Sequence, residues 1–205
     1  GNQLASITMF TNLISLKLKN RSDDVDQLLK NIEKHSKSLF TGTKDFIWSI
    51  DPESDDLDNL YTYIKDFGEE LYENTEIAFY SDISGKIREG IDLPSGWSRQ
   101  LVLIFKEAMT NTLKHAGATE VYLHLKLNKS DFVLILEDNG KGFTPEGKSK
   151  GNGLRNMRSR STQVGGSFEI LSRPGEGTRI RFTGELPGSS LEKKVKNMLN
   201  KKQQS

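Results

Sequence analysis

The sequence contains no cysteine and only three histidines. The absence of cysteine excludes disulfide bonds, thiolate nucleophiles and cysteine-ligated zinc, and it fits a reducing compartment. His35, His115 and His124 lie far apart in the sequence, without the spacing of metal ligands. We therefore expect no metal ion that is held by protein groups alone.

Long apolar runs are also missing, and the formal net charge is only +1. No run of about eighteen apolar residues occurs, so we expect no membrane contact by this part of the protein. The 29 lysines and arginines nearly balance the 28 aspartates and glutamates. No overall field would hold the chain on nucleic acid or on an anionic bilayer, so any binding must come from local sites.

Residues 1–50 have the apolar periodicity of a helical hairpin. The first helix carries, at roughly heptad spacing on one seam, Leu4, Ile7, Thr11, Ile14 and Leu18. After the turn "NRSDD", the second helix has on its inner side Leu28, Ile32, His35, Leu39 and Phe46. A hairpin of this size buries too little apolar surface to be stable alone. We expect a homodimer through a four-helix bundle; the alternative is packing on the rest of its own chain.

The stretch "WSIDPESDDLDNL" breaks this pattern and marks a domain boundary. Pro52 disfavours helix at Asp51, and Asp55 or Asp56 can cap a helix near residues 57–72. The later patterns predict strands near 76–81, 118–127, 131–138, 166–173 and 177–186, and helices over 95–115 and 154–163. This order predicts an α+β fold for residues 51–187, a two-layer sandwich with helices on one face of a mixed sheet. Residues 188–205 form a basic tail.

The stretch "FKEAMTNTLKHA" collects four polar groups on one side of a predicted helix. Residues four apart share a helix face, so Glu107, Asn111 and His115 form one row, with Lys114 beside it. Carboxylate and amide oxygens suit Mg²⁺, which binds through phosphates, water and one or two protein oxygens. The lysine and histidine would meet phosphate. The alternative is a helix end that only faces solvent.

Two glycine-containing stretches could complete a binding site. In "EDNGKGF", Asp138 ends a strand and can accept a hydrogen bond from an exocyclic amine such as that of adenine. Gly140 and Gly142 would let backbone approach a ligand closely, although such a sequence is also common in hairpin turns. In "KGNGLRNM", Gly151 and Gly153 precede a helix whose N–H groups could bind an anion. The alternative there is a flexible loop before a helix start.

Taken together and in this order, these segments resemble the nucleotide-binding domain of the superfamily that includes gyrase, Hsp90, the MutL mismatch-repair proteins and the two-component histidine kinases. The resemblance covers about residues 57–186. It implies ATP and Mg²⁺ as cofactors. In "EAMTNTLKHA" it implies Asn111 as a Mg²⁺ ligand, Glu107 near the metal-bound water or phosphoryl group, and Lys114 and His115 as phosphate contacts. These four residues are the expected catalytic set.

The same resemblance assigns the rest of the nucleotide site. In "DNGKGF" it implies that Asp138 recognises adenine in a pocket shaped by Gly140, Gly142 and Phe143. The stretch "GNGL" resembles the glycine box that closes a nucleotide lid, with Gly151, Asn152, Gly153 and Leu154. Thr178 in "GEGT" matches the threonine that supports the adenine contact. Lys148 and Lys150 would lie in the lid, which is expected to span residues 141–153.

Within the superfamily the chain is most similar to histidine kinases that carry an H-D-x-x-G dimerisation box. The similarity lies in "NTLKHA", "GLRNMRSR", "GGSFEILSRPGEGTRIRF" and the "IWSIDPESDDLDNL" linker. It implies transfer of the γ-phosphoryl group of ATP to a histidine, and relay to the receiver domain of a response regulator. It also implies a cytoplasmic location, and it leaves open whether the parent protein is anchored in the inner membrane.

The identity of the phosphoacceptor depends on Gly1. If Gly1 is the glycine of that box, the acceptor histidine lies four positions before it, outside this sequence, and Asn2 falls where the subfamily often has a phosphatase glutamine. Gly1 could instead be a cloning remnant. His35 is a weaker candidate acceptor, because the subfamily places its acceptor on the first helix. Two other functions stay open: a serine kinase of the anti-sigma type, and a non-catalytic dimerisation module that binds nucleotide.

Overall fold

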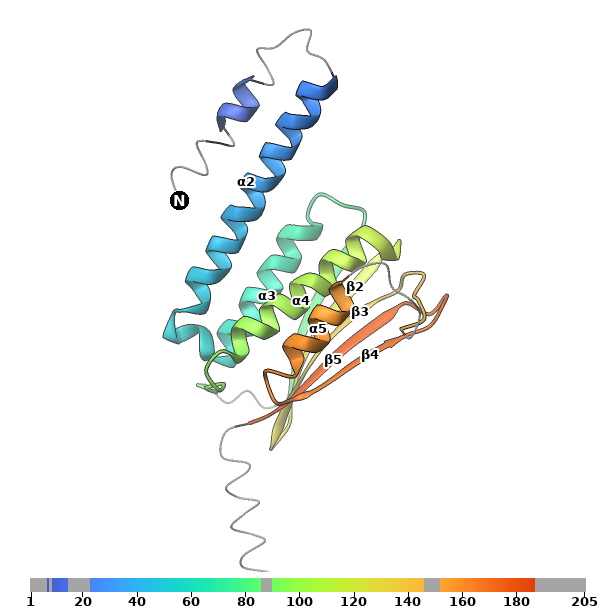
Figure 1. The fold of residues 1–205 in the computed structure, drawn as a ribbon. Coiled ribbons are helices and arrows are strands. Elements are labelled where there is room, and N and C mark those ends of the chain that lie inside the picture. The colour runs from blue at the N-terminus through green and yellow to red at the C-terminus, as the bar shows by residue number, and fades with distance from the viewer. Residues whose placement is uncertain (1–6, 8, 15–22, 86–89, 146–151, 187–205) are drawn as a thin grey trace, which may run out of the picture. The chain divides into compact units, whose positions relative to one another are not determined.

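The computed structural model describes residues 7, 9–14, 23–85, 90–145 and 152–186 (Figure 1). The chain separates into two compact units, Gly1–Asp51 and Pro52–Ser205. In the first unit, residues 9–14 are helical and α2 spans Asp23–Ser49.

The buried stripe of the first unit differs from the predicted seam. Thr11, Leu29 and Ser36 are buried within the single chain. The residues expected on the inner side of α2 are all exposed, namely Leu28, Ile32, His35, Leu39 and Phe46. Because Leu29 and Ser36 are one heptad apart, the buried stripe is offset by one residue from the predicted one. The predicted inner side was expected to be covered in a dimer, which the single chain does not test, so it stays a prediction; an apolar row along α2 is exposed.

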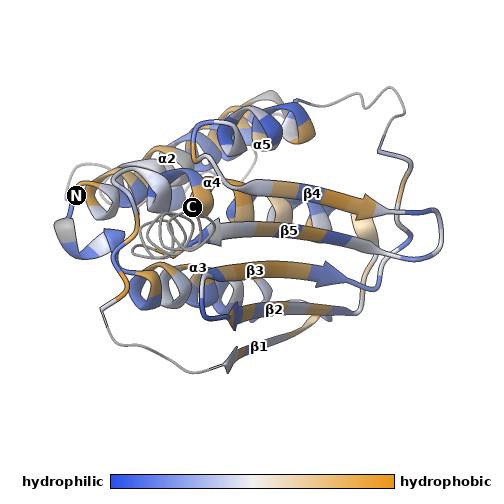
Figure 2. Ribbon diagram, turned by 90° about the horizontal axis from the view of Figure 1, so that it is seen from below, coloured by the Kyte–Doolittle hydropathy of each residue, from blue (hydrophilic) through white to orange (hydrophobic). Residues whose placement is uncertain are grey.

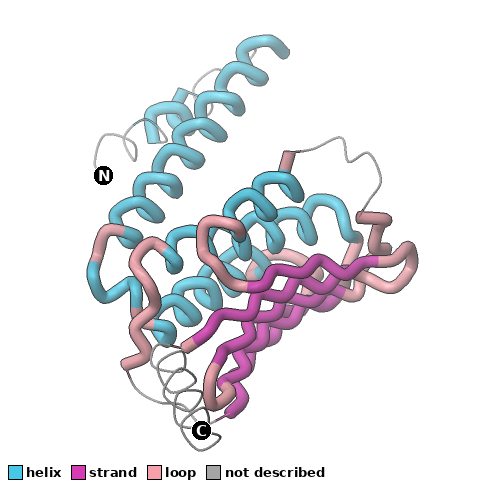
Figure 3. Tube along the Cα trace, turned by 60° about the horizontal axis from the view of Figure 1, so that its bottom comes forward, coloured by secondary structure: helices cyan, strands magenta, loops and turns pink. Residues whose placement is uncertain are grey.

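The described residues of the second unit form a five-stranded sheet and three main helices. Its elements are η1 (Pro52–Asp55), α3 (Leu57–Tyr72), β1 (Ala78–Gly85), α4 (Trp97–Asn111), η2 (Thr112–Ala116), β2 (Glu120–Leu127), β3 (Asp131–Asp138), α5 (Gly153–Ser161), β4 (Ser167–Ser172) and β5 (Thr178–Glu185). The strand order is β1-β2-β3-β5-β4. The β1–β2 pair is parallel, and the other pairs are antiparallel. Helices α3, α4 and α5 lie on one face of this sheet (Figures 2 and 3). The predicted mixed-sheet sandwich is confirmed.

Local sequence explains where these elements begin and which side they bury. Asp56 caps α3, because its Oδ1 accepts from the backbone N–H groups of Asp58 and Asn59 at 2.9 and 3.1 Å. Alternate residues of β2 are buried, whereas β3, in the middle of the sheet, is buried continuously over residues 132–136. The helices contribute to the core Leu57, Leu60, Ile64, Leu101, Ile104, Phe105 and Met109. Each such side chain stabilises the fold by about 1.5–3 kcal/mol relative to exposure.

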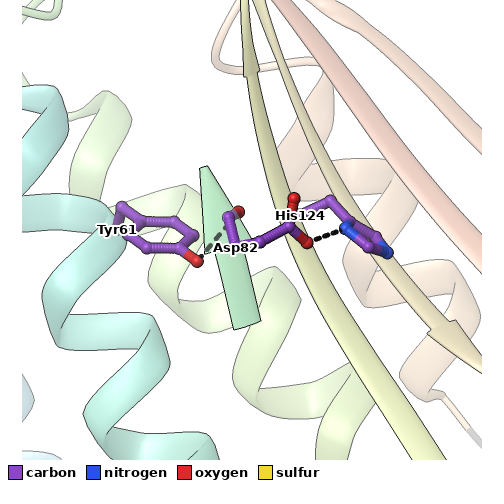
Figure 4. Close-up of polar contacts among 3 residues, drawn as sticks. All are labelled: Tyr61, Asp82 and His124. Atoms are coloured by element: carbon purple, nitrogen blue, oxygen red, sulfur yellow. Dashed lines mark hydrogen bonds and ion pairs between the residues drawn. The ribbon is translucent and has the colours of Figure 1, made fainter. Parts of the chain in front are cut away.

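Polar contacts attach the edge strand β1 to both layers (Figure 4). The Tyr61 hydroxyl of α3 donates to the Asp82 carbonyl oxygen at 3.0 Å. The Asp82 carboxylate pairs with Nδ1 of His124, its register partner on β2. His124 therefore lies half-buried among the polar residues of its strand, and its ring contributes to holding β1 in register.

The lack of long apolar runs predicts that no helix crosses a membrane. Over residues 7, 9–14, 23–85, 90–145 and 152–186, no helix combines the length and the apolar character that crossing a bilayer requires.

Candidate functional site

A pocket of about 640 Å³ lies between the end of α4, η2, the start of α5 and the strands β3 and β5. Eight of the sequence-predicted site residues line it: Asn111, His115, Asp138, Gly142, Phe143, Gly153, Leu154 and Thr178. They come from four segments: the end of α4 with η2, the end of β3 with the loop after it, the start of α5, and β5. The fold therefore brings together most of the residues that the motifs singled out.

Four predicted residues lie beside the pocket instead. Glu107 is one hydrogen bond away, because Asn111 Nδ2 donates to its Oε1 at 3.4 Å. Lys114 is exposed, Gly140 is buried against Ala116, and the Asn152 side chain accepts from Arg155 at 3.0 Å. None of the four is among the described residues that line the pocket. Gly151, Lys148 and Lys150 lie outside the described residues.

The helix that carries the first motif changes type inside it. Helix α4 ends at Asn111, and residues Thr112–Ala116 form a π-helical segment, η2. A π-turn winds more residues per turn than an α-turn, so His115 leaves the row that i, i+4 spacing predicts. It still lines the pocket with Asn111, whereas Lys114 does not. The expectation of one continuous α-helix to His115 is therefore corrected. Single-turn π segments inside helices are frequent at functional sites.

A buried tyrosine supports this change of helix type. The Tyr72 hydroxyl, from α3, donates to the Met109 carbonyl oxygen at 2.9 Å, one turn before η2. Burial raises the pKa of Tyr72, and the nearby Asp138 carboxylate raises this pKa further. The phenol therefore stays neutral and remains a donor throughout the physiological pH range. Sequence reasoning missed this residue, because a tyrosine among apolar helix positions gives no sign of its partner.

Asp138 ends β3 with a hydrogen-bond donor on each carboxylate oxygen. Gly140 N–H donates to Oδ1 at 2.9 Å, and Thr112 Oγ1 donates to Oδ2 at 3.1 Å. The side chain is buried. Around it the pocket is apolar, with contributions from Ala108, Leu136, Leu154, Met157 and Ile180. An apolar slot with one fixed acceptor suits a flat heterocycle that carries an amino group.

Thr178 faces Asp138 across the β3–β5 pair and belongs to a second set of hydrogen bonds. Ser172 Oγ donates to the Gly177 carbonyl at 2.8 Å and accepts from Phe143 N–H at 2.9 Å. The Ser172 proton is thereby used, so Thr178 Oγ1, 3.1 Å away, is the donor to Ser172. Ser172 fastens the loop after β3 to the start of β5. Motif reasoning did not include it, because a strand serine has no distinctive spacing.

The glycines of "DNGKGF" are required by the protein itself. Gly142 has a φ of +59°, and a Cβ there would collide with the Arg173 carbonyl oxygen. At Gly140 a Cβ would lie 2.6 Å from the Ala116 carbonyl oxygen. The close approach expected for a ligand is therefore made by neighbouring backbone. These contacts clamp the loop between η2 and the β4–β5 connection.

Gly153, the first residue of α5, packs against the polar end of α4. A Cβ at this position would meet Glu107 Oε1 and lie 3.3 Å from Asn111 Nδ2. The start of α5 has no side-chain cap, so its N–H groups stay available beside Asn111. The helix N-terminus carries partial positive charge, which favours an anion at this end of the pocket.

The donor set at that end also bears on the expected Mg²⁺ ion. In the described part of the chain, no three His, Cys, Asp or Glu side chains converge as a metal site would require. Asn111 uses its amide nitrogen on Glu107, so its oxygen is the atom that can reach a cation. One amide oxygen with a carboxylate beside it fits the share that Mg²⁺ takes from proteins.

Comparisons with known proteins agree with this geometry. The Staphylococcus aureus (strain COL) sensor protein VraS is 42% identical over 96 residues, which cover 46% of this chain and 27% of VraS. The Staphylococcus epidermidis VraS (strain ATCC 35984) is 39% identical over 100 residues, 48% of this chain and 28% of that protein. The match thus spans little more than a quarter of each relative.

Solved structures show the same fold. The Acinetobacter baumannii histidine kinase AdeS superposes with a TM-score of 0.53 at 13% identity, covering 90% of this chain and 95% of that one. The Erythrobacter litoralis EL346 blue-light activated histidine kinase gives 0.52 at 17% identity, covering 94% and 61%. Residues 96–188 match the family described as histidine kinase-, DNA gyrase B-, and HSP90-like ATPase. Residues 96–188 therefore match an ATPase domain of this family, and 96 residues of the chain are homologous to part of the sensor protein VraS.

Proposed function

We propose that this chain is the ATP-binding catalytic portion of a sensor histidine kinase. It would transfer the γ-phosphoryl group of ATP to a histidine, for relay to the receiver domain of a response regulator. The observation that carries the proposal is that one pocket is lined both by a buried carboxylate, Asp138, and by an amide, Asn111, which lies beside Gly153 at the start of α5. We take the carboxylate side as the base end and the amide side as the phosphate end.

The base end would bind adenine. Asp138 accepts from the exocyclic amine, since both of its oxygens keep a free lone pair after binding Gly140 and Thr112. Leu154, Met157 and Ile180 supply apolar contacts for the faces of the ring. Thr178 uses its proton on Ser172 and therefore offers its own oxygen toward the base or a bridging water.

The other end would bind the triphosphate and Mg²⁺. Asn111 would ligate the ion, with Glu107 near the metal-bound water or phosphoryl group; bound there, Mg²⁺ supplies charge neutralisation on the phosphates. His115 and the exposed Lys114 donate to phosphate oxygens, together with N–H groups at Asn152 and Gly153. Catalysis then rests on positioning and charge stabilisation, with little covalent chemistry by this unit.

The acceptor and the partners belong to the same proposal. Of the three histidines, His115 lines the pocket and His124 pairs with Asp82. His35 is exposed on α2 but lies on the second helix of its unit, so we do not assign it as the acceptor. The apolar row that α2 exposes supports dimerisation of residues 1–51 as a four-helix bundle. The receiver domain would act on the dimer in the cytoplasm.

The first test measures nucleotide binding by calorimetry. Wild-type chain should bind Mg·ATP, and Asp138→Asn should weaken binding about tenfold or more, because a hydrogen bond to a charged group is lost. Asp131→Asn is the matched control, since it makes the same change at the other end of β3 and should bind normally. No heat and no rise in melting temperature with millimolar ATP and Mg²⁺ would refute the proposal.

The second test measures transfer. The chain is mixed with labelled ATP and a helical bundle that carries the H-D-x-x-G box. Acid-labile phosphate on the box histidine is the expected product. Acid-stable phosphate on serine would point to the anti-sigma type of kinase, and ATP binding without any transfer would point to a non-catalytic module.

A further inference from the structure

A threonine hydroxyl lies buried against the carboxylate at the base end of the pocket. Thr112 is 4% exposed, and its Oγ1 is 3.1 Å from Asp138 Oδ2. Thr112 is the first residue of η2, so the change to π-helical winding and this contact occur at the same position. Asp138 itself is 9% exposed and lines the pocket.

The hydroxyl proton has three nearby acceptors. Two are neutral oxygens, the Ala108 carbonyl at 3.3 Å and the Tyr72 phenol oxygen, and the third is Asp138 Oδ2 at 3.1 Å. A hydrogen bond to a carboxylate is about twice as strong as one to a neutral oxygen, so the proton goes to Asp138. Tyr72 cannot replace it, because the Tyr72 proton is used on the Met109 carbonyl.

Two donors on opposite oxygens fix the carboxylate plane. Gly140 N–H fixes Oδ1 through the backbone, whereas Thr112 fixes Oδ2 through a side chain. Without the hydroxyl, Oδ2 would be a buried acceptor with one partner fewer, and the carboxylate could rotate about its Cβ–Cγ bond. Only the Thr112 contact can be removed by substitution without changing the backbone.

We propose that Thr112 is a positioning residue that sets the base preference of the pocket, by holding Asp138 as an oriented acceptor for an amino group. The inference rests on the proposed function. An oriented acceptor favours a purine with a 6-amino group and opposes one with a 6-oxo group, whose lone pairs face those of the carboxylate. Thr112 touches Asp138 and acts on the ligand through it.

The test compares two nucleotides that differ only at that position, ATP and ITP. Binding of each, with Mg²⁺, is measured by calorimetry for wild type and for Thr112→Val, which has the same shape without the hydroxyl. Thr112→Ser restores the donor. Thr110→Val makes the identical change on the same helix, at a residue that is not among the described residues lining the pocket. Thr112→Ala provides a second hydroxyl deletion in case the valine does not fold.

The expected result is a selective loss. Thr112→Val should weaken ATP binding about tenfold, the size of one charged hydrogen bond, while ITP binding changes little. Thr112→Ser and Thr110→Val should keep the wild-type ratio of ATP to ITP affinity. An unchanged ratio in both hydroxyl deletions, or an equal loss for both nucleotides, overturns the inference. Absence of ATP binding by the wild-type chain overturns the proposed function, and the inference with it.

Discussion

Replacing Gly153 by alanine should separate the stability of the protein from its use of Mg²⁺. Gly153 begins α5, and its φ is not in the left-handed region, so alanine fits the backbone. The added methyl group would meet Glu107 Oε1 and lie 3.3 Å from Asn111 Nδ2. The end of a glutamate side chain can move away at small cost. The movement breaks the 3.4 Å hydrogen bond from Asn111 to Glu107.

The two effects on stability nearly cancel. Alanine is better than glycine in a helix by up to about 1 kcal/mol. Losing one long, partly exposed hydrogen bond costs about 0.5–1.5 kcal/mol. The free energy of unfolding should therefore stay within about 1 kcal/mol of wild type, or about 2–4 °C in melting temperature. The groups expected at the metal are nevertheless displaced.

The assay is ATP affinity with Mg²⁺ and with EDTA. Gly153→Ala should lose about threefold to tenfold in the Mg²⁺-dependent part, because Asn111 and Glu107 are no longer held together. Affinity in EDTA should change little. Gly42→Ala is the control, since a Cβ there meets nothing within 4 Å on helix α2. An unaltered response to Mg²⁺ in Gly153→Ala would refute the assignment of these two side chains to the metal.

Two further predictions concern stability. Gly142→Ala should cost at least about 1 kcal/mol more in urea unfolding than Gly175→Ala: both glycines have positive φ, +59° and +86°, but only Gly142 would collide with backbone, at Arg173. Equal urea midpoints for the two variants would contradict the close backbone contact around Gly142. Tyr72→Phe should lower stability by about 1 kcal/mol at pH 7. The pKa of Tyr72 is raised above 10.0 in the folded state, so wild-type stability falls above about pH 10, as the unfolded tyrosine ionises first, and the variant lacks this loss. If wild type exceeds Tyr72→Phe in free energy of unfolding by the same amount at pH 7 and pH 11, burial does not raise the pKa of Tyr72.

Sequence patterns correctly predicted the helices and strands whose apolar periodicity allows only one assignment of secondary structure. Asp56 caps α3 as expected, and β2 and β3 follow their apolar patterns closely. Asn111 and Asp138 were each ambiguous alone, and they could be selected because their motifs occur together in one order along the sequence. The sheet then brings them to one pocket. The order of the motifs along the sequence indicated that Asn111 lies on a helix, that Asp138 ends a strand, and that both belong to one site.

Other features have no signature of that kind. The α-to-π change at Thr112 leaves an apolar pattern that also fits a continuous α-helix. The hydroxyl contacts of Thr112 and Ser172 depend on partners far away in sequence. On α2, apolar pairs such as Leu28 and Leu29 allow two neighbouring seams, and only packing decides which is buried. Sequence patterns therefore do not predict the partners of uncharged hydroxyl groups, nor which of two apolar faces of a helix is buried.

The pocket rests on two different supports, with consequences for how such a protein can change. Asp138 and Thr178 are register partners in the sheet, whereas Asn111 and Gly153 belong to helices packed on it. A substitution that slides α5 would move Gly153 away from Glu107 and Asn111, and it would leave the β3–β5 register between Asp138 and Thr178 in place. A substitution that shifts this register would separate Asp138 from Thr178 and leave Gly153 against the end of α4. The α5 side of the pocket can therefore vary while the sheet contacts of Asp138 stay the same.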